Sequence, residues 1–296
     1  MNEKQLTHRL LALHYVFPVP LNRLAPLFQV DAELEALEHM STQRITKLLK
    51  LSYEKANKLK SAYIKMLETP LLQAYEQKSI TPIPYYHPLF PKTLFDLCDP
   101  PACLYVKGQV GLLYNERKMA IVGSRKATAY TEKALQCIMP PLVEHDYIIV
   151  SGLAKGADRM AHESAITNGG KTIAVLGHGL FHLYPKENAK LAEIISQNHL
   201  LVTEYPPYIG PKRWYFPMRN RIISGMSKAI LVTEAAEKSG TSSTMDHALE
   251  HGKDIFVVPG DITSKLSLGP HKLLSEGATP VWNGYQIVAE LERNFV

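Results

Sequence analysis

The chain has 296 residues, of which 46% are hydrophobic and 21% charged, a composition typical of folded globular proteins and unlike disordered ones. Its longest apolar runs, such as residues 119–122 and 255–258, are far too short to cross a bilayer, and residues 1–14 lack the apolar core of a secretory signal. The formal net charge of +5 permits a polyanionic partner without requiring one.

The three cysteines Cys98, Cys103 and Cys137 form no CxxC pair and stand in apolar sequence. We expect them to be small buried hydrophobic residues rather than disulfide or metal ligands. An odd number of thiols favours a reducing compartment, and a cytoplasmic location is therefore expected.

Residues 1–75 are predicted to form an all-helical N-terminal domain. Apolar residues recur at helical spacing from Leu6 to Leu13 and from Leu21 to Phe28, and further helices are expected over 31–40 and 41–67. Prolines at 18, 20 and 26 divide the first part into short pieces.

A run of cations lies between positions 41 and 66, opposed only by Glu54. The run consists of Arg44, Lys47, Lys50, Lys55, Lys58, Lys60 and Lys65. We favour the solvated face of a helix as its interpretation; the alternative is a second contact surface for nucleic acid phosphates.

Residues 80–106 are dense in proline and aromatic side chains, a texture that indicates an irregular, extended connector packed on something larger. The domain boundary is placed just before this segment. The chain thus divides into a helical domain over 1–75 and a second domain over 76–296.

After residue 118 the pattern becomes strand, turn and helix, repeated. Strands are predicted at 119–123, 147–151, 172–177, 200–203, 229–233 and 254–259, with a last short one around 277–282. Helices are predicted at 131–143, 158–167, 187–197, 220–226 and 243–251. Apolar strands that alternate with helices indicate a parallel sheet covered on both faces. The fold class is therefore α/β, a Rossmann-like doubly wound and mostly parallel sheet.

Ligands of such sheets bind beyond the carboxyl ends of the strands. Five of the predicted strands lead into loops rich in glycine or hydroxyl residues, at 123–125, 151–156, 177–179, 239–244 and 259–261. We interpret the glycines as letting the backbone approach a ligand, and the hydroxyls and helix-start amides as suited to a phosphate.

Cations follow several of the same strands. They are Arg125, Lys155, Lys186, Arg219 and Arg221, with Trp214, Tyr215 and Phe216 as possible stacking surfaces. Gathered at one edge of a sheet, cations and rings suit single-stranded nucleic acid, since the charges follow the backbone and the rings take the bases. The spacing predicts a positive pocket at this edge.

Several enzymatic motifs are incomplete. The Gly177-His178-Gly179 loop has histidine at 182 where a dinucleotide fingerprint needs glycine, and His162-Glu163 lacks the second histidine of a zinc-protease helix. No Walker loop or GxSxG elbow occurs. His247 and His251 stand four apart without a third ligand nearby in sequence, so no metal and no cofactor are expected.

Glu234 ends an apolar strand before a Ser-Gly-Thr-rich segment and leaves two possibilities open. It could act as a base near a phosphate-bearing ligand, as in a nucleoside-monophosphate hydrolase. We favour a structural role, in which its carboxylate accepts hydrogen bonds from neighbouring loop amides. For the protein as a whole, a further possibility is an interaction scaffold whose main surface binds protein.

The motifs taken together resemble those of the DNA-processing protein A family (DprA/Smf). The resemblance begins at residues 121–125 with Thr128 and Tyr130, and covers about 80–282 in order. It continues through Ser151-Gly152, Ala161-His162, Tyr184-Pro185, Arg219-Asn220-Arg221, Glu234-Ala235, Ser239-Gly240 and Val258-Pro259-Gly260. Departures from the family pattern occur at Ala157, Met245-Asp246 and His271.

The resemblance implies a homodimeric DNA-binding protein of bacterial natural transformation that performs no catalysis. Such a protein would protect incoming single-stranded DNA, overcome the barrier posed by single-strand-binding protein and help to load RecA recombinase. The N-terminal helices would form a domain similar to a sterile alpha motif, and no C-terminal winged helix is expected. The implied DNA-binding residues are Gly123, Ser124, Arg125, Lys186, Arg219, Asn220, Arg221, Ser239 and Gly240.

Overall fold

The computed structural model describes residues 3–237 and 252–293. Its centre is a nine-stranded sheet in the order β1-β2-β6-β5-β4-β3-β7-β8-β9. The parallel strands are β3 (Lys118–Val122), β4 (Ile148–Ser151), β5 (Thr172–Val175), β6 (Leu200–Thr203), β7 (Ala229–Val232), β8 (Asp254–Val257) and β9 (Thr279–Pro280). The predicted α/β class with a mostly parallel, doubly wound sheet is confirmed.

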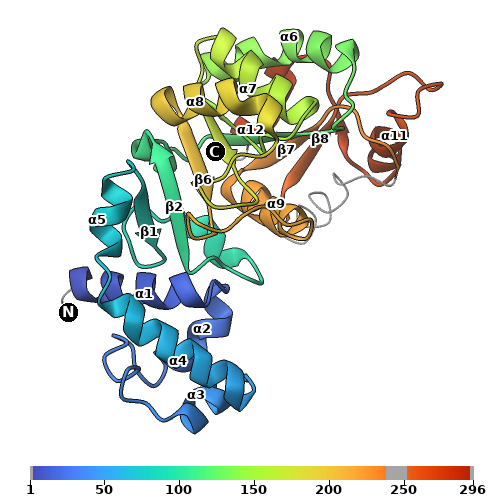
Figure 1. Cartoon of the computed structure of the whole chain (residues 1–296). Coiled ribbons are helices and arrows are strands. Elements are labelled where there is room, and N and C mark those ends of the chain that lie inside the picture. Colours follow the sequence, from blue (N-terminus) through green and yellow to red (C-terminus); the bar gives the residue numbers. More distant parts are fainter. Residues whose placement is uncertain (1–2, 238–251, 294–296) are drawn as a thin grey trace.

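Helices cover both faces of the sheet (Figure 1). Apolar residues of α6 (Ala129–Glu144), α7 (Ala157–Thr167) and α12 (Gly284–Arg293) pack on one face of β3, β4, β7 and β8, and α8 (Ala189–Asn198) packs beside them on β5 and β6. The opposite face is covered by α9 (Tyr215–Met226) and α11 (Leu268–Ser275), with the short 3₁₀ helix η1 (Lys92–Asp96). Because both faces are buried, the strands can be apolar at every position.

The segment predicted as an irregular connector contains two strands instead. β1 (Thr81–Pro84) pairs antiparallel with β2 (Cys103–Gly108), which pairs antiparallel with β6. The prolines of β1 are tolerated because β1 is the edge strand, where backbone N–H groups on one side need no partner. The 3₁₀ helix η2 (Val110–Leu113) then leads to β3.

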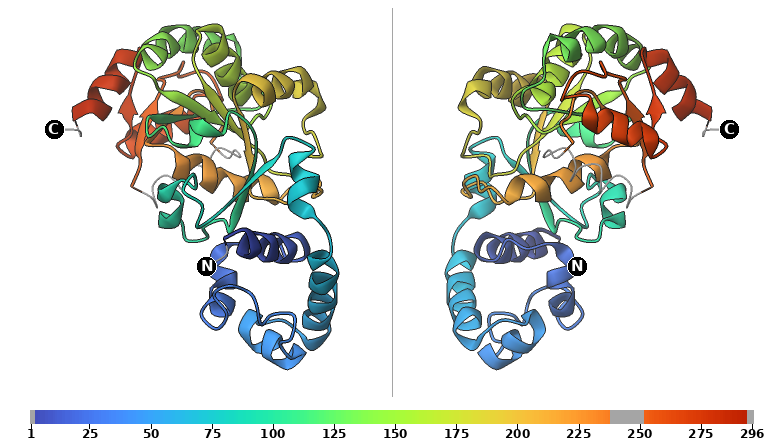
Figure 2. Two further views of the ribbon diagram at one scale, coloured as in Figure 1. Left: turned by 90° about the vertical axis from the view of Figure 1, so that its left-hand side faces the viewer. Right: turned by 90° about the vertical axis from the view of Figure 1, so that its right-hand side faces the viewer.

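The N-terminal region consists of α1 (Glu3–Val16), α2 (Leu21–Phe28), α3 (Thr42–Leu49), α4 (Tyr53–Leu67) and α5 (Leu71–Glu76). Figure 2 shows these helices gathered at one end of the molecule, beside the β1–β2 edge. Their buried leucines share one core with Ile80, Cys103 and Tyr105 of the sheet domain. The hydroxyl of Tyr105 lies 3.0 Å from His14 Nδ1 in this contact.

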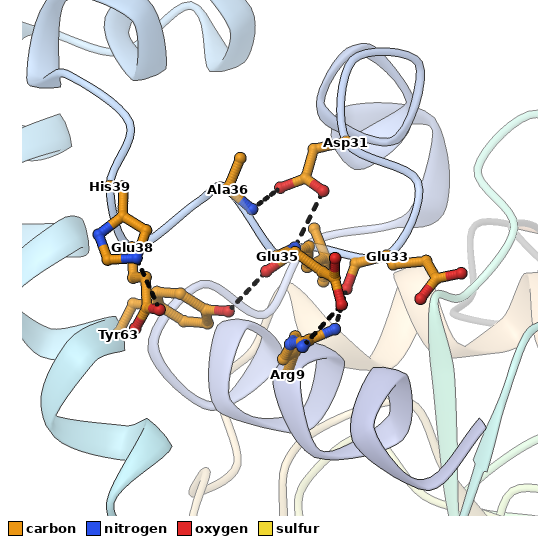
Figure 3. Close-up of polar contacts among 9 residues, drawn as sticks. Arg9, Asp31, Glu33, Glu35, Ala36, Glu38, His39 and Tyr63 are labelled. Carbon is orange, nitrogen blue, oxygen red and sulfur yellow. Dashed lines mark hydrogen bonds and ion pairs between the residues drawn. The ribbon is translucent and has the colours of Figure 1, made fainter. Parts of the chain in front are cut away.

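One helix prediction in this region was wrong, and another predicted helical run is divided into two helices. Residues 31–40 form turns, held by the carboxylate of Asp31, which accepts hydrogen bonds from the amides of Glu35 and Ala36 (Figure 3). Arg9 of α1 braces the same segment by pairing with Glu35 at 3.0 Å. The run 41–67 is two helices, because Lys50 is left-handed (φ 51°) and Ser52 caps a new helix.

The cysteine expectation was also wrong in part. Cys103 is buried in the core shared with the N-terminal helices, whereas Cys98 and Cys137 are exposed. All three are free thiols. Within the described residues, no helix is long and apolar enough to cross a membrane.

Candidate nucleic-acid interface

A pocket of about 590 Å³, named the Arg125 pocket after one of its lining residues, opens at the carboxyl edge of the sheet. Its walls come from the loop after β3, the start of α7, the loop after β5 and the start of α9. Beyond β3 the chain moves to β4 on one side, and it later returns to β7 on the other. The pocket thus lies beside the topological switch point, where open α/β sheets bind ligands.

Three exposed cations line this pocket: Arg125, Lys126 and Arg213. In the described part of the chain none of them forms an ion pair with a carboxylate. The guanidinium carbon of Arg125 lies 5.8 Å from the centre of the Phe216 ring, and that ring is 5.3 Å from the Tyr184 ring. Unpaired positive charge beside two rings in a recess attracts an anionic ligand that can also stack.

Arg219 forms part of the floor of the pocket but points into the protein. Its side chain is 4% exposed, and its guanidinium donates to the carbonyls of Gly152, at 2.5 Å, and Val175. Burial lowers the pKa of Arg219 to about 10, and the nearby charge of Asp158 opposes that shift. The group stays protonated at neutral pH and ties the ends of β4 and β5 together.

Gly152 explains how Arg219 fits. A Cβ atom at this position would lie 2.3 Å from a guanidinium nitrogen, so only glycine leaves room for the buried arginine. The expectation that glycines here serve the approach of a ligand is corrected at this position, because the neighbouring atoms are the protein's own. The same holds at Gly156, where a Cβ would lie 2.3 Å from the carbonyl oxygen of Ser124.

Asp158 organises the loop after β4 from the first turn of α7. Its carboxylate accepts hydrogen bonds from the amides of Gly152 and Ala154, at 3.1 and 3.3 Å. Burial raises the pKa of Asp158, while the Arg219 charge and these hydrogen bonds act in the opposite direction. Arg219 and Asp158 therefore form one buried charged unit beneath the exposed cations.

Arg221 does not line the pocket. It is 4% exposed and pairs with Glu204, just beyond β6, at 2.6 Å. Asn220 does line the pocket, and its side-chain oxygen accepts a hydrogen bond from Arg219 Nε. The two arginines of the predicted Arg-Asn-Arg set thus point into the fold, because α9 begins at Tyr215 rather than near Asn220.

Lys186 lies outside the lining set but close to it. It is exposed on η3 (Lys186–Asn188), two residues after Tyr184 of the pocket wall. The next residue, Glu187, pairs with Lys155. Of the cations predicted from sequence, Arg125 is in the pocket, Lys186 follows its rim and Lys155 is paired with a carboxylate.

Glu234 holds the loop after β3 in place. Its carboxylate accepts hydrogen bonds from the Thr128 amide (2.7 Å), the Thr128 hydroxyl (2.9 Å) and the Thr131 hydroxyl (2.8 Å). Its backbone carbonyl accepts from the amide of Ser124. Glu234 is 5% exposed and does not line the pocket, so its contacts are those of the structural role favoured from sequence.

Ser239, Gly240 and the remainder of the 239–244 loop lie outside the described residues, as do His247 and His251. Elsewhere in the described ranges, no three His, Cys, Asp or Glu side chains gather in a way that could hold a metal ion.

Sequence reasoning did not single out Lys126, Asp158 or Arg213 as pocket residues. Lys126 directly follows Arg125, and Arg213 precedes the aromatic run 214–216, so adjacency to predicted contacts was the available signal. Asp158 lies in the first turn of α7, where a carboxylate is favoured by the partial positive charge of the helix N-terminus, and this was its available signal.

Comparisons with known proteins agree with this architecture. A family model described as DNA recombination-mediator protein A matches residues 81–292. DNA processing protein DprA of Bacillus subtilis (strain 168) is 42% identical over 225 residues, which cover 76% of each chain. Protein Smf of Escherichia coli (strain K12) is 33% identical over 293 residues, 99% of this chain and 76% of that protein.

Two solved structures share the fold. DNA processing protein A from Streptococcus pneumoniae gives a TM-score of 0.79 at 32% identity, covering 94% of this chain and 95% of that one. The Helicobacter pylori protein gives a TM-score of 0.66 at 30% identity, covering 73% and 96%. The family match spans the whole sheet and every wall of the Arg125 pocket, and the chain belongs to the DNA recombination-mediator protein A family.

Proposed function

We propose that this chain binds single-stranded DNA with little sequence preference and holds a few nucleotides in the Arg125 pocket. One observation carries the proposal: the exposed cations Arg125, Lys126 and Arg213 stand beside Tyr184 and Phe216 in one recess. Cations that follow a phosphate backbone read no sequence, and rings stack with any base.

The relatives support this choice of ligand. The Helicobacter pylori structure is described as giving insight into a single-stranded DNA binding mode. The Streptococcus pneumoniae and Bacillus subtilis relatives are described as DNA processing proteins. We extend single-stranded DNA binding to this chain because all residues of the pocket fall within the region that the family model matches.

The proposal gives the residues two kinds of role. Contacts to the strand are assigned to Arg125, Lys186, Gly123 and Ser124, together with Ser239 and Gly240. Lys126 and Arg213 join them because they line the pocket. Arg219, Asn220 and Arg221 become positioning residues, because their side chains are buried and contact other groups of the protein.

At the level of the cell, we propose that the protein works in the cytoplasm during natural transformation, as a homodimer. It would protect incoming strands, overcome the barrier of single-strand-binding protein and help to load RecA recombinase. These steps need binding surfaces and no covalent chemistry, so no catalytic residue and no cofactor is assigned.

A hydrolase function for Glu234 has a direct test. The three hydrogen bonds that its carboxylate accepts from Thr128 and Thr131 support a structural role. Incubation of the protein with each nucleoside monophosphate is expected to release no free base on a chromatographic assay. Base release that disappears in Glu234→Gln would replace the binding proposal with the enzymatic one.

The binding proposal is tested by removing two cations. Arg125→Ala/Lys186→Ala is expected to weaken binding of oligo-dT and to reduce the log–log salt slope by about 0.7 for each lost phosphate contact. Lys107→Ala/Lys171→Ala removes two cations near the amino ends of the parallel strands, away from the pocket. This control variant should change neither the affinity nor the salt slope. Fluorescence anisotropy across a salt series measures both. An unchanged affinity and slope in the Arg125/Lys186 variant would contradict the pocket assignment.

A further inference from the structure

An aromatic surface with its own cation lies immediately outside the pocket. Trp214 is 62% exposed, and Lys212 Nζ stands 5.5 Å from the Trp214 ring centre and 5.4 Å from that of Tyr215. We call Lys212, Trp214 and Tyr215 the Trp214 platform. Lys212 has no carboxylate partner in the part of the chain that the structure describes.

The platform is anchored on one side and open on the other. The Tyr215 ring packs against buried Tyr205, with ring centres 4.1 Å apart. The Tyr215 amide donates to the carbonyl of Lys212 at 3.0 Å, which fixes the turn that leads into α9. Trp214 contacts Tyr215 at 5.9 Å between ring centres but stays largely in solvent. A fixed ring next to an exposed indole provides a stacking surface that need not be ordered on binding.

The platform continues the pocket. Arg213, which stands between Lys212 and Trp214, lines the pocket. Phe216, two residues after Trp214, also lines it. The Arg125 guanidinium lies over the Phe216 ring in a cation–π contact. The short segment 212–216, which leads into α9, therefore supplies the whole platform and also two pocket residues, Arg213 and Phe216. A chain of nucleotides leaving the pocket on this side would meet Lys212 and Trp214 next.

The second tryptophan, Trp282, is also exposed but lies in a different setting. Trp282 is 65% exposed and follows β9, at the opposite edge strand from β1. Within the described residues, no lysine or arginine stands over its ring. In the part of the chain that the structure describes, Trp214 alone of the two tryptophans combines an exposed ring face with a nearby lysine and a neighbouring pocket.

We propose that the Trp214 platform is a second nucleotide subsite, which takes the base and phosphate of the nucleotide next to those in the Arg125 pocket. The base stacks on the indole of Trp214 and the phosphate contacts the ammonium group of Lys212. This inference rests on the proposed binding of single-stranded DNA and deepens it, because it gives the strand a direction out of the pocket.

The test uses the small number of tryptophans. In Trp282→Phe, Trp214 is the remaining tryptophan, so its fluorescence reports on the platform alone. Addition of oligo-dT of about twelve nucleotides is expected to quench this fluorescence and to protect it from acrylamide. Saturation by the oligonucleotide, confirmed by anisotropy, with no change in Trp214 emission would overturn the subsite.

Affinity gives the second measurement. Trp214→Ala is expected to weaken binding about 5- to 150-fold, the range that corresponds to loss of one base–aromatic stack, without changing the salt slope. Lys212→Ala should lower the slope by about 0.7. Trp282→Ala is the matched control and should bind as the wild type does. Equal affinities for Trp214→Ala and Trp282→Ala would refute the second subsite. The Arg125/Lys186 variant tests the binding pocket itself, so the two proposals can fail independently.

Discussion

Buried Arg219 is the residue on which the geometry of the pocket depends. It links the carbonyls of Gly152 and Val175 and lies near Asp158, while the cations that face solvent are other residues. Positive charge in this region therefore has two uses. Inside, it holds strand ends together; outside, it remains unpaired for a ligand. Substitutions of the buried and of the exposed arginines should therefore have different effects on stability and on DNA binding.

Arg219→Gln is expected to destabilise the protein by about 1–3 kcal/mol for each of the buried carbonyls of Gly152 and Val175 that loses its donor. Arg213→Gln, at an exposed position in the same pocket, should change stability by less than about 0.5 kcal/mol and yet weaken DNA binding. Urea unfolding followed by circular dichroism measures the first effect. Equal stabilities of the two variants would contradict the positioning role of Arg219.

His162 predicts a pH dependence of stability. Its Nδ1 lies 2.6 Å from the Thr172 hydroxyl, which itself donates to Ile149, so Nδ1 carries the proton and buried Nε2 has no partner. Burial, with a smaller contribution from Arg219, lowers the pKa of His162 from 6.5 to about 3. Between those values the unfolded chain binds the proton and the folded chain does not, so stability falls as the pH drops below 6.5.

The slope of unfolding free energy against pH between about 4.5 and 6 should therefore be smaller in His162→Gln than in the wild type, by up to about 1.4 kcal/mol per pH unit. Urea titrations at several pH values give the slope. Parallel pH profiles for the two proteins would show that His162 is not held neutral in the fold.

At the scale of elements, the loops at the carboxyl edge pack on one another. The Ser124 carbonyl accepts from the Ala157 amide at 3.0 Å, and the Ser124 amide donates to Glu234, so the loop after β3 is held by its neighbours on both sides. Gly156 makes the first contact possible, because its φ of 72° and its missing side chain let α7 begin against Ser124.

Gly156→Ala is expected to cost about 2–4 kcal/mol, from a left-handed backbone and a clash with the Ser124 carbonyl. Gly169→Ala provides the matched control. Its φ is 76°, but a Cβ there meets nothing within 4 Å, so only the conformational cost of about 1–2 kcal/mol applies. Thermal or urea unfolding compares the two. An equal loss of unfolding free energy in both variants would show that the contact with the Ser124 carbonyl adds no cost.

The parallel strands were predictable because each is a short apolar run followed by a loop, and their observed ends differ from the expected ones by two residues at most. The β1–β2 pair was not predictable in this way, because prolines in an edge strand give the same sequence pattern as an irregular segment. In the site, Arg125 followed directly from the strand-end rule. The inward turn of Arg219 and Arg221 did not, because it depends on α9 starting at Tyr215, which the aromatic run and Pro217 obscure.

At the scale of the whole molecule, the N-terminal helices and the sheet domain share a core. Cys103 of β2 lies in it together with Tyr105 and the leucines of α1 and α2, and burial raises the pKa of its thiol. A second contact joins Tyr15 of α1 to Tyr208, with ring centres 4.3 Å apart. Orientation of the helices relative to the pocket is therefore fixed by buried side chains rather than by a linker.

Cys103 reports on this packing. In Cys98→Ser/Cys137→Ser, the remaining thiol is expected to be unreactive toward a thiol reagent in native buffer and to react only when urea unfolds the chain. The single variant Cys103→Ser should instead show two fast thiols. Rapid labelling of Cys103 under native conditions would mean that the N-terminal helices detach from the sheet domain.

In the proposed complex, single-stranded DNA occupies the recess between Arg125, Phe216 and Tyr184. A crystal structure with bound oligo-dT tests it most directly. We expect phosphates within hydrogen-bonding distance of Arg125 and a base against the Phe216 or Tyr184 ring. A strand bound instead along the basic face of α3 and α4, with the Arg125 pocket empty, would contradict it.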